Sequence, residues 1–188
     1  MHTDPTGYTA RKERERQRQA EQALAGRDIG ELPEVVDPER KEACSQDFRL
    51  FCESYFPATF ALGWSDDHLR AIEKIETAVL RGGLFAMAMP RGSGKTTLAE
   101  AACTWAVLYG HHAFVCLIAS TADHAANLLE GIQVELETNE LLLEDFPEAV
   151  YPIHKLERFT QRTKCQLYLG QPTRITWTSV LLVMPTIP

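Results

Sequence analysis

Residues 85–102, FAMAMPRGSGKTTLAEAA, decide the fold expected for this chain. The stretch begins inside the apolar run LFAMAM at 84–89, passes through a loop with two glycines, and continues as a helix-forming segment. A short run that is apolar throughout is typical of a strand buried on both faces of a parallel sheet. Because the free N–H groups at a helix N-terminus attract anions, the order strand, glycine loop, helix predicts a phosphate-binding site.

The segments around this unit continue an α/β pattern. Apolar residues recur at helical spacing in four segments, which predicts four helices. Their predicted inward-facing residues are Phe48, Phe51, Cys52, Tyr55 and Phe56; Leu69, Ile72, Ile75 and Val79; Leu98, Ala101, Ala102, Trp105 and Leu108; and Ala125, Leu128, Leu129, Ile132 and Leu136. Ser65 or Asp66 is predicted to cap the second helix, and Ser120 with Asp123 to form a capping box for the fourth.

Two further regions read as strands. The run AFVCLIAS at 113–120 is predicted as a second buried strand. The segments 164–170 and 173–184 predict a β-hairpin joined near Gly170.

The fold class that follows is α/β, because strands that alternate with helices indicate a parallel sheet with flanking helices. With the glycine loop, we expect an incomplete P-loop NTPase of the RecA or helicase type, with an N-terminal helical extension and a C-terminal β-hairpin. Two parts are expected: a charged extension and linker at 1–42, disordered or a lone helix, and a partial P-loop ATPase domain at 43–188.

Bulk composition narrows the class of protein. The net charge of −7 argues against general nucleic-acid binding, although a local basic groove can coexist with it. No run approaches the roughly 20 apolar residues of a membrane helix, and the N-terminus lacks the apolar core of a secretory signal. The five cysteines form no C-x-x-C pair, which favours reduced thiols. We therefore expect a cytoplasmic protein that does not enter a membrane.

The loop predicts which residues bind a nucleotide. We expect its amides to point at the β-phosphate, Lys95 to reach the β- and γ-phosphates, and the Thr96 hydroxyl to bind Mg²⁺. The predicted nucleotide-binding residues here are Gly92, Ser93, Gly94, Lys95, Thr96 and Thr97, with ATP and Mg²⁺ as cofactors. The pattern G-x-x-x-x-G-K-[ST] asks for glycine where this chain has Met89. The core GSGKT therefore carries the prediction, and an ordinary glycine turn that starts a helix is the alternative.

Arg91 is a second candidate catalytic residue beside Lys95. A guanidinium inside the loop could stabilise charge that develops on the γ-phosphate, as an arginine finger does. A surface arginine, or one paired with a neighbouring acid, is the alternative.

Three segments resemble the N-terminal ATPase of large terminase subunits, the DNA-packaging motors of tailed bacteriophages and prophages. They are WSDDHLRAIEKI at 64–75, AMPRGSGKTTLAEAACTWAVLYG at 88–110 and FVCLIASTADHAANLLEGIQVELETN at 114–139. The resemblance covers about residues 45 to 188, and the loop is its most specific part. That family often has a deviant phosphate loop with an arginine near its start, which Met89 and Arg91 match.

The resemblance implies further residues and partners. The segment before the loop touches adenine in that family, which makes Trp64 and His68 candidates for nucleotide binding; a core tryptophan and a helix-cap histidine are the alternatives. Ser120 and Thr121 end the second predicted strand, where related motors contact nucleic acid or shape the site; plain capping is the alternative. Double-stranded DNA, a small terminase subunit and a portal are the implied partners, in the bacterial cytoplasm, with an oligomer possible.

A motor also needs an apolar strand that ends in Asp-Glu. The segment LLLED at 141–145 has the acids in reversed order and continues a helical pattern, so we do not expect Glu144 and Asp145 to be catalytic. In the family the acidic pair and the nuclease lie further along, and we expect them to fall outside this chain. The expectation is thus a truncated ATP-binding portion with little or no turnover. A non-catalytic nucleotide-binding remnant, or a fragment of another P-loop ATPase or helicase, remains an alternative.

Overall fold

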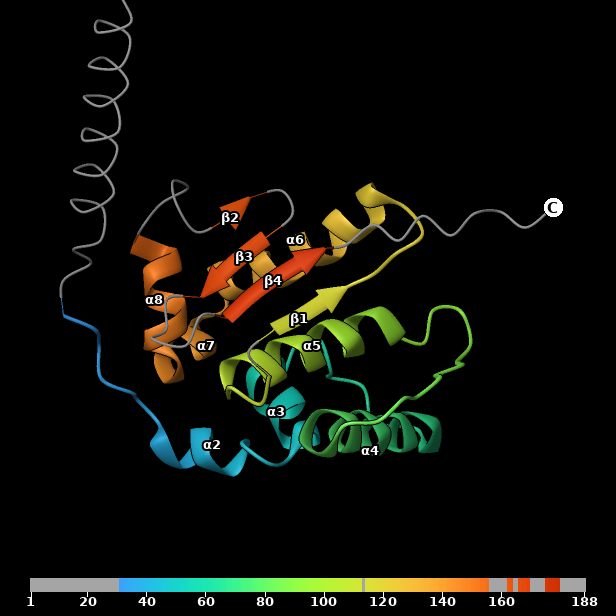
Figure 1. Ribbon diagram of the computed structural model, residues 1–188. Coiled ribbons are helices and arrows are strands. Elements are labelled where there is room, and N and C mark those ends of the chain that lie inside the picture. The colour runs from blue at the N-terminus through green and yellow to red at the C-terminus, as the bar shows by residue number, and fades with distance from the viewer. Residues whose placement is uncertain (1–30, 113, 156–161, 164–165, 170–174, 180–188) are drawn as a thin grey trace, which may run out of the picture.

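The computed structural model describes residues 31–112, 114–155, 162–163, 166–169 and 175–179 (Figure 1). Helices dominate this part of the chain. They are α2 (Pro38–Ala43), α3 (Phe48–Tyr55), α4 (Asp66–Arg81), α5 (Lys95–Leu108), α6 (Ala122–Thr138), α7 (Glu140–Asp145) and α8 (Pro147–Lys155). The strands are β1 (Phe114–Leu117), β2 (Arg162–Thr163), β3 (Gln166–Leu169) and β4 (Ile175–Ser179).

The strands form a small mixed sheet in the order β1-β4-β3-β2. β1 and β4 are parallel, with Phe114 opposite Thr176, whereas β3 is antiparallel to both β4 and β2. α6 packs on the sheet, and α5 lies beside β1 with α3 and α4 on its other side (Figure 1). The glycine loop at the start of α5 therefore lies on the helical side of the molecule (Figure 1).

The predicted fold class, a P-loop NTPase with a RecA-like parallel sheet, is wrong. Residues 84–89, expected as its central strand, form no strand and are largely exposed. Among the described strands, only β1 and β4 pair in parallel. Gly82 and Gly83, with φ of 79° and 133°, follow α4 with a backbone that L side chains rarely adopt. The apolar run then passes α4 on its way to α5 without joining the sheet (Figure 1).

Two smaller predictions also need correction. The strand expected at 113–120 is the short β1, and Phe114 is exposed where burial was expected. The cap of α6 is Thr121, whose hydroxyl accepts a hydrogen bond from the His124 amide at 3.2 Å, in place of the predicted box of Ser120 and Asp123.

The helical predictions are confirmed where the apolar stripe is continuous. Every predicted inward-facing residue of α3 and of α5 is buried. Ser65 caps α4 as predicted, by accepting a hydrogen bond from the His68 amide, and Gly82 ends this helix. Leu69 is 37% exposed, and Ile75, Val79 and Leu128 are only partly buried, so the inward-facing residues predicted for α4 and α6 are confirmed only in part.

A cluster of aromatic rings anchors α5 to α3. The Phe48 and Trp105 rings lie 5.3 Å apart, and both side chains are fully buried. The Trp105 indole N–H donates to the Cys44 carbonyl at 2.9 Å, so its one polar group is satisfied. This packing fixes the helix whose N-terminus follows the glycine loop.

A buried carboxylate joins α2 to α7. Asp145 is 0% exposed and accepts hydrogen bonds from Arg40 Nε at 2.6 Å, from the Tyr55 hydroxyl at 2.6 Å and from the Asp37 amide at 3.1 Å. Arg40 also reaches Glu144 at 3.1 Å. Residues 38–42 of the expected linker thus lie in an ordered helix, and residues 1–30 of the predicted extension lie outside the described residues.

Within the described ranges, no helix has the length and apolar character that crossing a membrane requires.

Candidate phosphate-binding site

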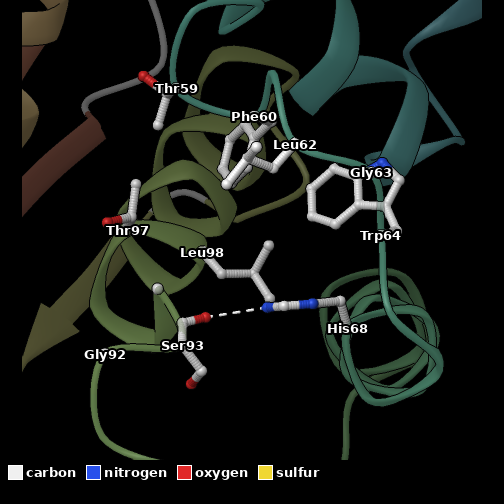
Figure 2. Close-up of a pocket in the computed structure, with 11 residues that line it drawn as sticks. Thr59, Phe60, Leu62, Gly63, Trp64, His68, Gly92, Ser93, Thr97 and Leu98 are labelled. Atoms are coloured by element: carbon white, nitrogen blue, oxygen red, sulfur yellow. Dashed lines mark hydrogen bonds between the residues drawn. The ribbon is translucent and has the colours of Figure 1, made fainter.

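A cavity of about 310 Å³ lies between the loop that precedes α4 and the glycine loop that precedes α5 (Figure 2). This volume is at the lower end of the range usual for small-molecule sites, which is about 300–1,000 Å³. The residues that line it are Thr59, Phe60, Leu62, Gly63, Trp64, His68, Gly92, Ser93, Gly94, Thr97 and Leu98.

The glycine loop has a backbone that leaves room for a ligand. Gly92 and Gly94 have φ of 82° and 72°, in the left-handed region that favours glycine. A Cβ placed on either would meet no atom within 4 Å, so open space adjoins both. Gly94 is the N-cap of α5, and no side chain caps this helix. The N–H groups of its first turn are therefore open to an anion.

Ser93 supplies an unsatisfied polar atom at the same place. Its Oγ is buried and has no hydrogen-bond partner among the residues that the structure describes. Buried hydroxyls nearly always have a partner, because an unpaired one loses its bond to water without replacement. The orphaned hydroxyl fits a site whose ligand carries acceptor oxygens.

Lys95 is bound to the loop itself. Its ammonium donates to the Met89 and Pro90 carbonyls, each at 2.7 Å. Lys95 does not line the cavity. A phosphate would have to displace these two neutral carbonyls, and it can compete because its oxygens carry a negative charge that attracts the ammonium.

The opposite wall of the cavity is aromatic. The Phe60 and Trp64 rings lie 5.1 Å apart in a tilted arrangement. The Trp64 indole donates to Glu53 at 2.7 Å, which satisfies its N–H while the ring faces the cavity. Hydrogen bonds from Arg49, which has the larger effect, and from Trp64 lower the pKa of Glu53. Such a wall suits a flat ring, because offset or edge contacts between rings are favourable.

His68 connects the two sides of the cavity. Its Nε2 lies 2.9 Å from the Ser93 carbonyl oxygen, and its Nδ1 lies 2.7 Å from the Ser65 hydroxyl (Figure 2). Its ring centroid is 6.0 Å from that of Trp64, in an edge arrangement.

The predicted residues fall into two groups. Six of the predicted residues line the cavity: Gly92, Ser93, Gly94, Thr97, Trp64 and His68. Arg91 and Thr96 are exposed at the loop and do not line it, and Lys95 is held by the loop carbonyls. Ser120 and Thr121 are not among the lining residues, and Thr121 caps α6.

Metal ligands are not gathered in the described part of the chain, where no group of three or more His, Cys, Asp or Glu side chains could hold an ion. Glu144 and Asp145, which the sequence did not favour as catalytic acids, lie on α7 and are paired with Arg40. The predicted contact between Thr96 and Mg²⁺ therefore remains a prediction.

Sequence reasoning missed the aromatic row that leads to the cavity. Phe56, Phe60 and Trp64 follow one another every four residues, and neighbouring rings lie 6.3 Å and 5.1 Å apart. This spacing was visible in FPATFALGW at 56–64. Pro57 and Gly63 indicate that this segment is a loop, and a helical period is not expected in a loop.

Comparison of the chain with protein-family models, with curated proteins and with solved structures gives no match in any of the three.

Proposed function

We propose that this chain binds the phosphates of ATP, together with Mg²⁺, at the glycine loop 92–96. In this proposal it is the ATP-binding portion of the large terminase subunit of a tailed bacteriophage or prophage. The observation that carries the proposal is the meeting of three features at one place. These are the left-handed glycines Gly92 and Gly94, the orphaned hydroxyl of Ser93 and the cavity with its aromatic wall.

The residues present fit a nucleotide. The uncapped start of α5 and the Ser93 hydroxyl would hold phosphate oxygens, and the wall of Phe60 and Trp64 would face a base. Bound Mg²⁺ would supply charge neutralisation for the phosphates. These contacts need the loop and the cavity, and none of them requires a parallel sheet.

The motor's other partners belong to the proposal through the sequence resemblance. They are double-stranded DNA, a small terminase subunit and a portal, and the bacterial cytoplasm is the compartment in which packaging would take place. Arg91 is exposed at the start of the loop, and its role in this proposal is a contact with the γ-phosphate.

A nucleotide-binding module without turnover is the second candidate. The observation that favours it is that Glu144 and Asp145 serve the contact between α2 and α7, away from the residues that line the cavity. Phosphate release from ATP at a rate above background, abolished by Lys95→Ala, would favour the motor over this module.

Replacing Lys95 with alanine is expected to weaken binding of Mg²⁺-ATP by about 10- to 100-fold. The reason is the loss of a charged donor to phosphate, which is worth about 1.5–3 kcal/mol. The measurement is a titration of a fluorescent ATP analogue, with unlabelled ATP as competitor.

Lys74→Ala is the matched control, because Lys74 is an exposed lysine on α4 that does not line the cavity. It should leave the affinity within about twofold of wild type. Equal affinity of wild type and Lys95→Ala would contradict phosphate binding by this loop. A loss of similar size in both variants would show only a general effect of positive charge.

A further inference from the structure

His68 holds the loop by one ring nitrogen and its own helix by the other. Nε2 lies 2.9 Å from the Ser93 carbonyl oxygen, and Nδ1 lies 2.7 Å from the Ser65 hydroxyl. A carbonyl oxygen only accepts hydrogen bonds, so a neutral His68 must carry its proton on Nε2. Nδ1 then accepts from the Ser65 hydroxyl. The first turn of α4 thereby fixes both the tautomer and the orientation of the ring.

The loop needs such a restraint. Ser93 stands between Gly92 and Gly94, both in the left-handed region, and glycines have the largest backbone freedom to lose on ordering. Within the described part of the chain, the only backbone–backbone hydrogen bond at Ser93 runs from its amide to the Pro90 carbonyl, and it is long at 3.4 Å. The bond from His68 is shorter, and it comes from a different helix.

We propose that His68 is a positioning residue, which holds the Ser93 carbonyl so that the amides of the phosphate loop stay ordered for an anion. This inference rests on the proposed nucleotide function and deepens it. It favours the helix-cap alternative for His68 over the contact with adenine, because both ring nitrogens are engaged and neither is left to bind the edge of a base. The base side of the cavity is then formed by Phe60 and Trp64.

A positioning role predicts a loss that depends on phosphate. His68→Ala should weaken binding of ADP and of inorganic pyrophosphate by about tenfold, the size expected for one lost hydrogen bond. Binding of adenosine, which has no phosphate, should stay within about twofold of wild type. His68→Gln should recover most of the loss, since its side-chain amide can donate to the Ser93 carbonyl.

The matched control is His124→Ala. His124 occupies the same third position of α6 that His68 occupies in α4, and its amide bonds to the cap Thr121. Among the described residues, His124 has no hydrogen bond to the loop, and it does not line the cavity. If the effect of His68→Ala were only the loss of a histidine near a helix start, His124→Ala would share it.

Amide hydrogen exchange of residues 92–96 in the ligand-free protein separates this inference from the proposed function. We expect faster exchange in His68→Ala than in wild type and in His124→Ala. Faster exchange with no binding of ADP or pyrophosphate by wild type would overturn the nucleotide function and leave the hold on the loop intact. Unchanged exchange, an equal loss for adenosine and pyrophosphate, or unchanged pyrophosphate affinity in His68→Ala would each overturn the positioning role.

Discussion

Asp145→Ala is expected to lower the free energy of unfolding by about 3 kcal/mol, and the melting temperature by roughly 6–12 °C. Asp145 is fully buried, and its two oxygens accept from Arg40, Tyr55 and the Asp37 amide. Removing it leaves the Tyr55 hydroxyl and the Arg40 charge without their partner. The expected loss is at the lower end of the usual 3–5 kcal/mol for a broken buried pair, because Arg40 is partly exposed and water can solvate it.

Glu144→Gln is the control for this prediction. Glu144 pairs with the same guanidinium but is 42% exposed, and exposed ion pairs contribute about 0–1 kcal/mol. Urea denaturation followed by circular dichroism measures both variants. Equal destabilisation by the two would show that burial of Asp145 is not what makes the α2–α7 contact strong.

The same carboxylate predicts how stability depends on pH. Burial alone would raise the pKa of Asp145, but hydrogen bonds from Arg40 and Tyr55 outweigh it, so the pKa is lowered. A lowered pKa in the folded state gives stability that is present above the unfolded pKa, near 3.9, and is lost as pH falls through the folded pKa. The stability difference between wild type and Asp145→Asn should therefore be constant near neutral pH and shrink below about pH 4.

Trp105→Ala is expected to destabilise the protein by about 3–5 kcal/mol. The side chain is fully buried against Phe48 and His111, with ring centroids 5.3 Å and 4.9 Å away. Its removal leaves a large cavity at the α3–α5 contact and leaves the Cys44 carbonyl without its donor. Chemical denaturation measures the loss.

Trp64→Ala is the matched tryptophan control. Trp64 is only partly buried, and its indole bonds to an exposed glutamate, so its loss should cost less than half as much as that of Trp105. If both substitutions destabilised the protein equally, the aromatic cluster around Trp105 would not be the anchor of α5.

The parts of the fold that sequence predicted are those in which the signal is local. The stripes of α3 and α5 repeat at helical spacing, and one face of a helix is decided by neighbours three and four residues away. The cap Ser65 and the end at Gly82 are local signals of the same kind. The loop 92–96 and its position at the start of α5 were predicted correctly for the same reason, because glycines followed by an apolar helical stripe are a local signal.

The failures involve long-range contacts. LFAMAM at 84–89 has no period, and an all-apolar run becomes a central strand only if other strands pair with it on both sides. The partners of Asp145 lie 90 to 108 residues earlier in the chain, so its burial with Arg40 and Tyr55 has no trace in the local pattern. The bond from His68 to Ser93 spans 25 residues and depends on how α4 packs beside α5. The sequence offered His68 as a nucleotide contact or as a helix-cap histidine, and the capping box of α4 bears out the second, whereas the bond to Ser93 was not predicted.

Phosphate binding by the loop 92–96 is tested most directly by titrating ¹⁵N-labelled protein with Mg²⁺-ATP and with pyrophosphate. The chemical shifts of the backbone amides and of the Trp64 indole N–H report where each ligand binds. We expect both ligands to shift the amides of Gly92 to Thr97 most strongly, and ATP alone to shift the Trp64 indole as well, since only ATP carries a base. Saturating ligand that leaves these amides unmoved, or that shifts α6 to α8 instead, would contradict phosphate binding at this loop.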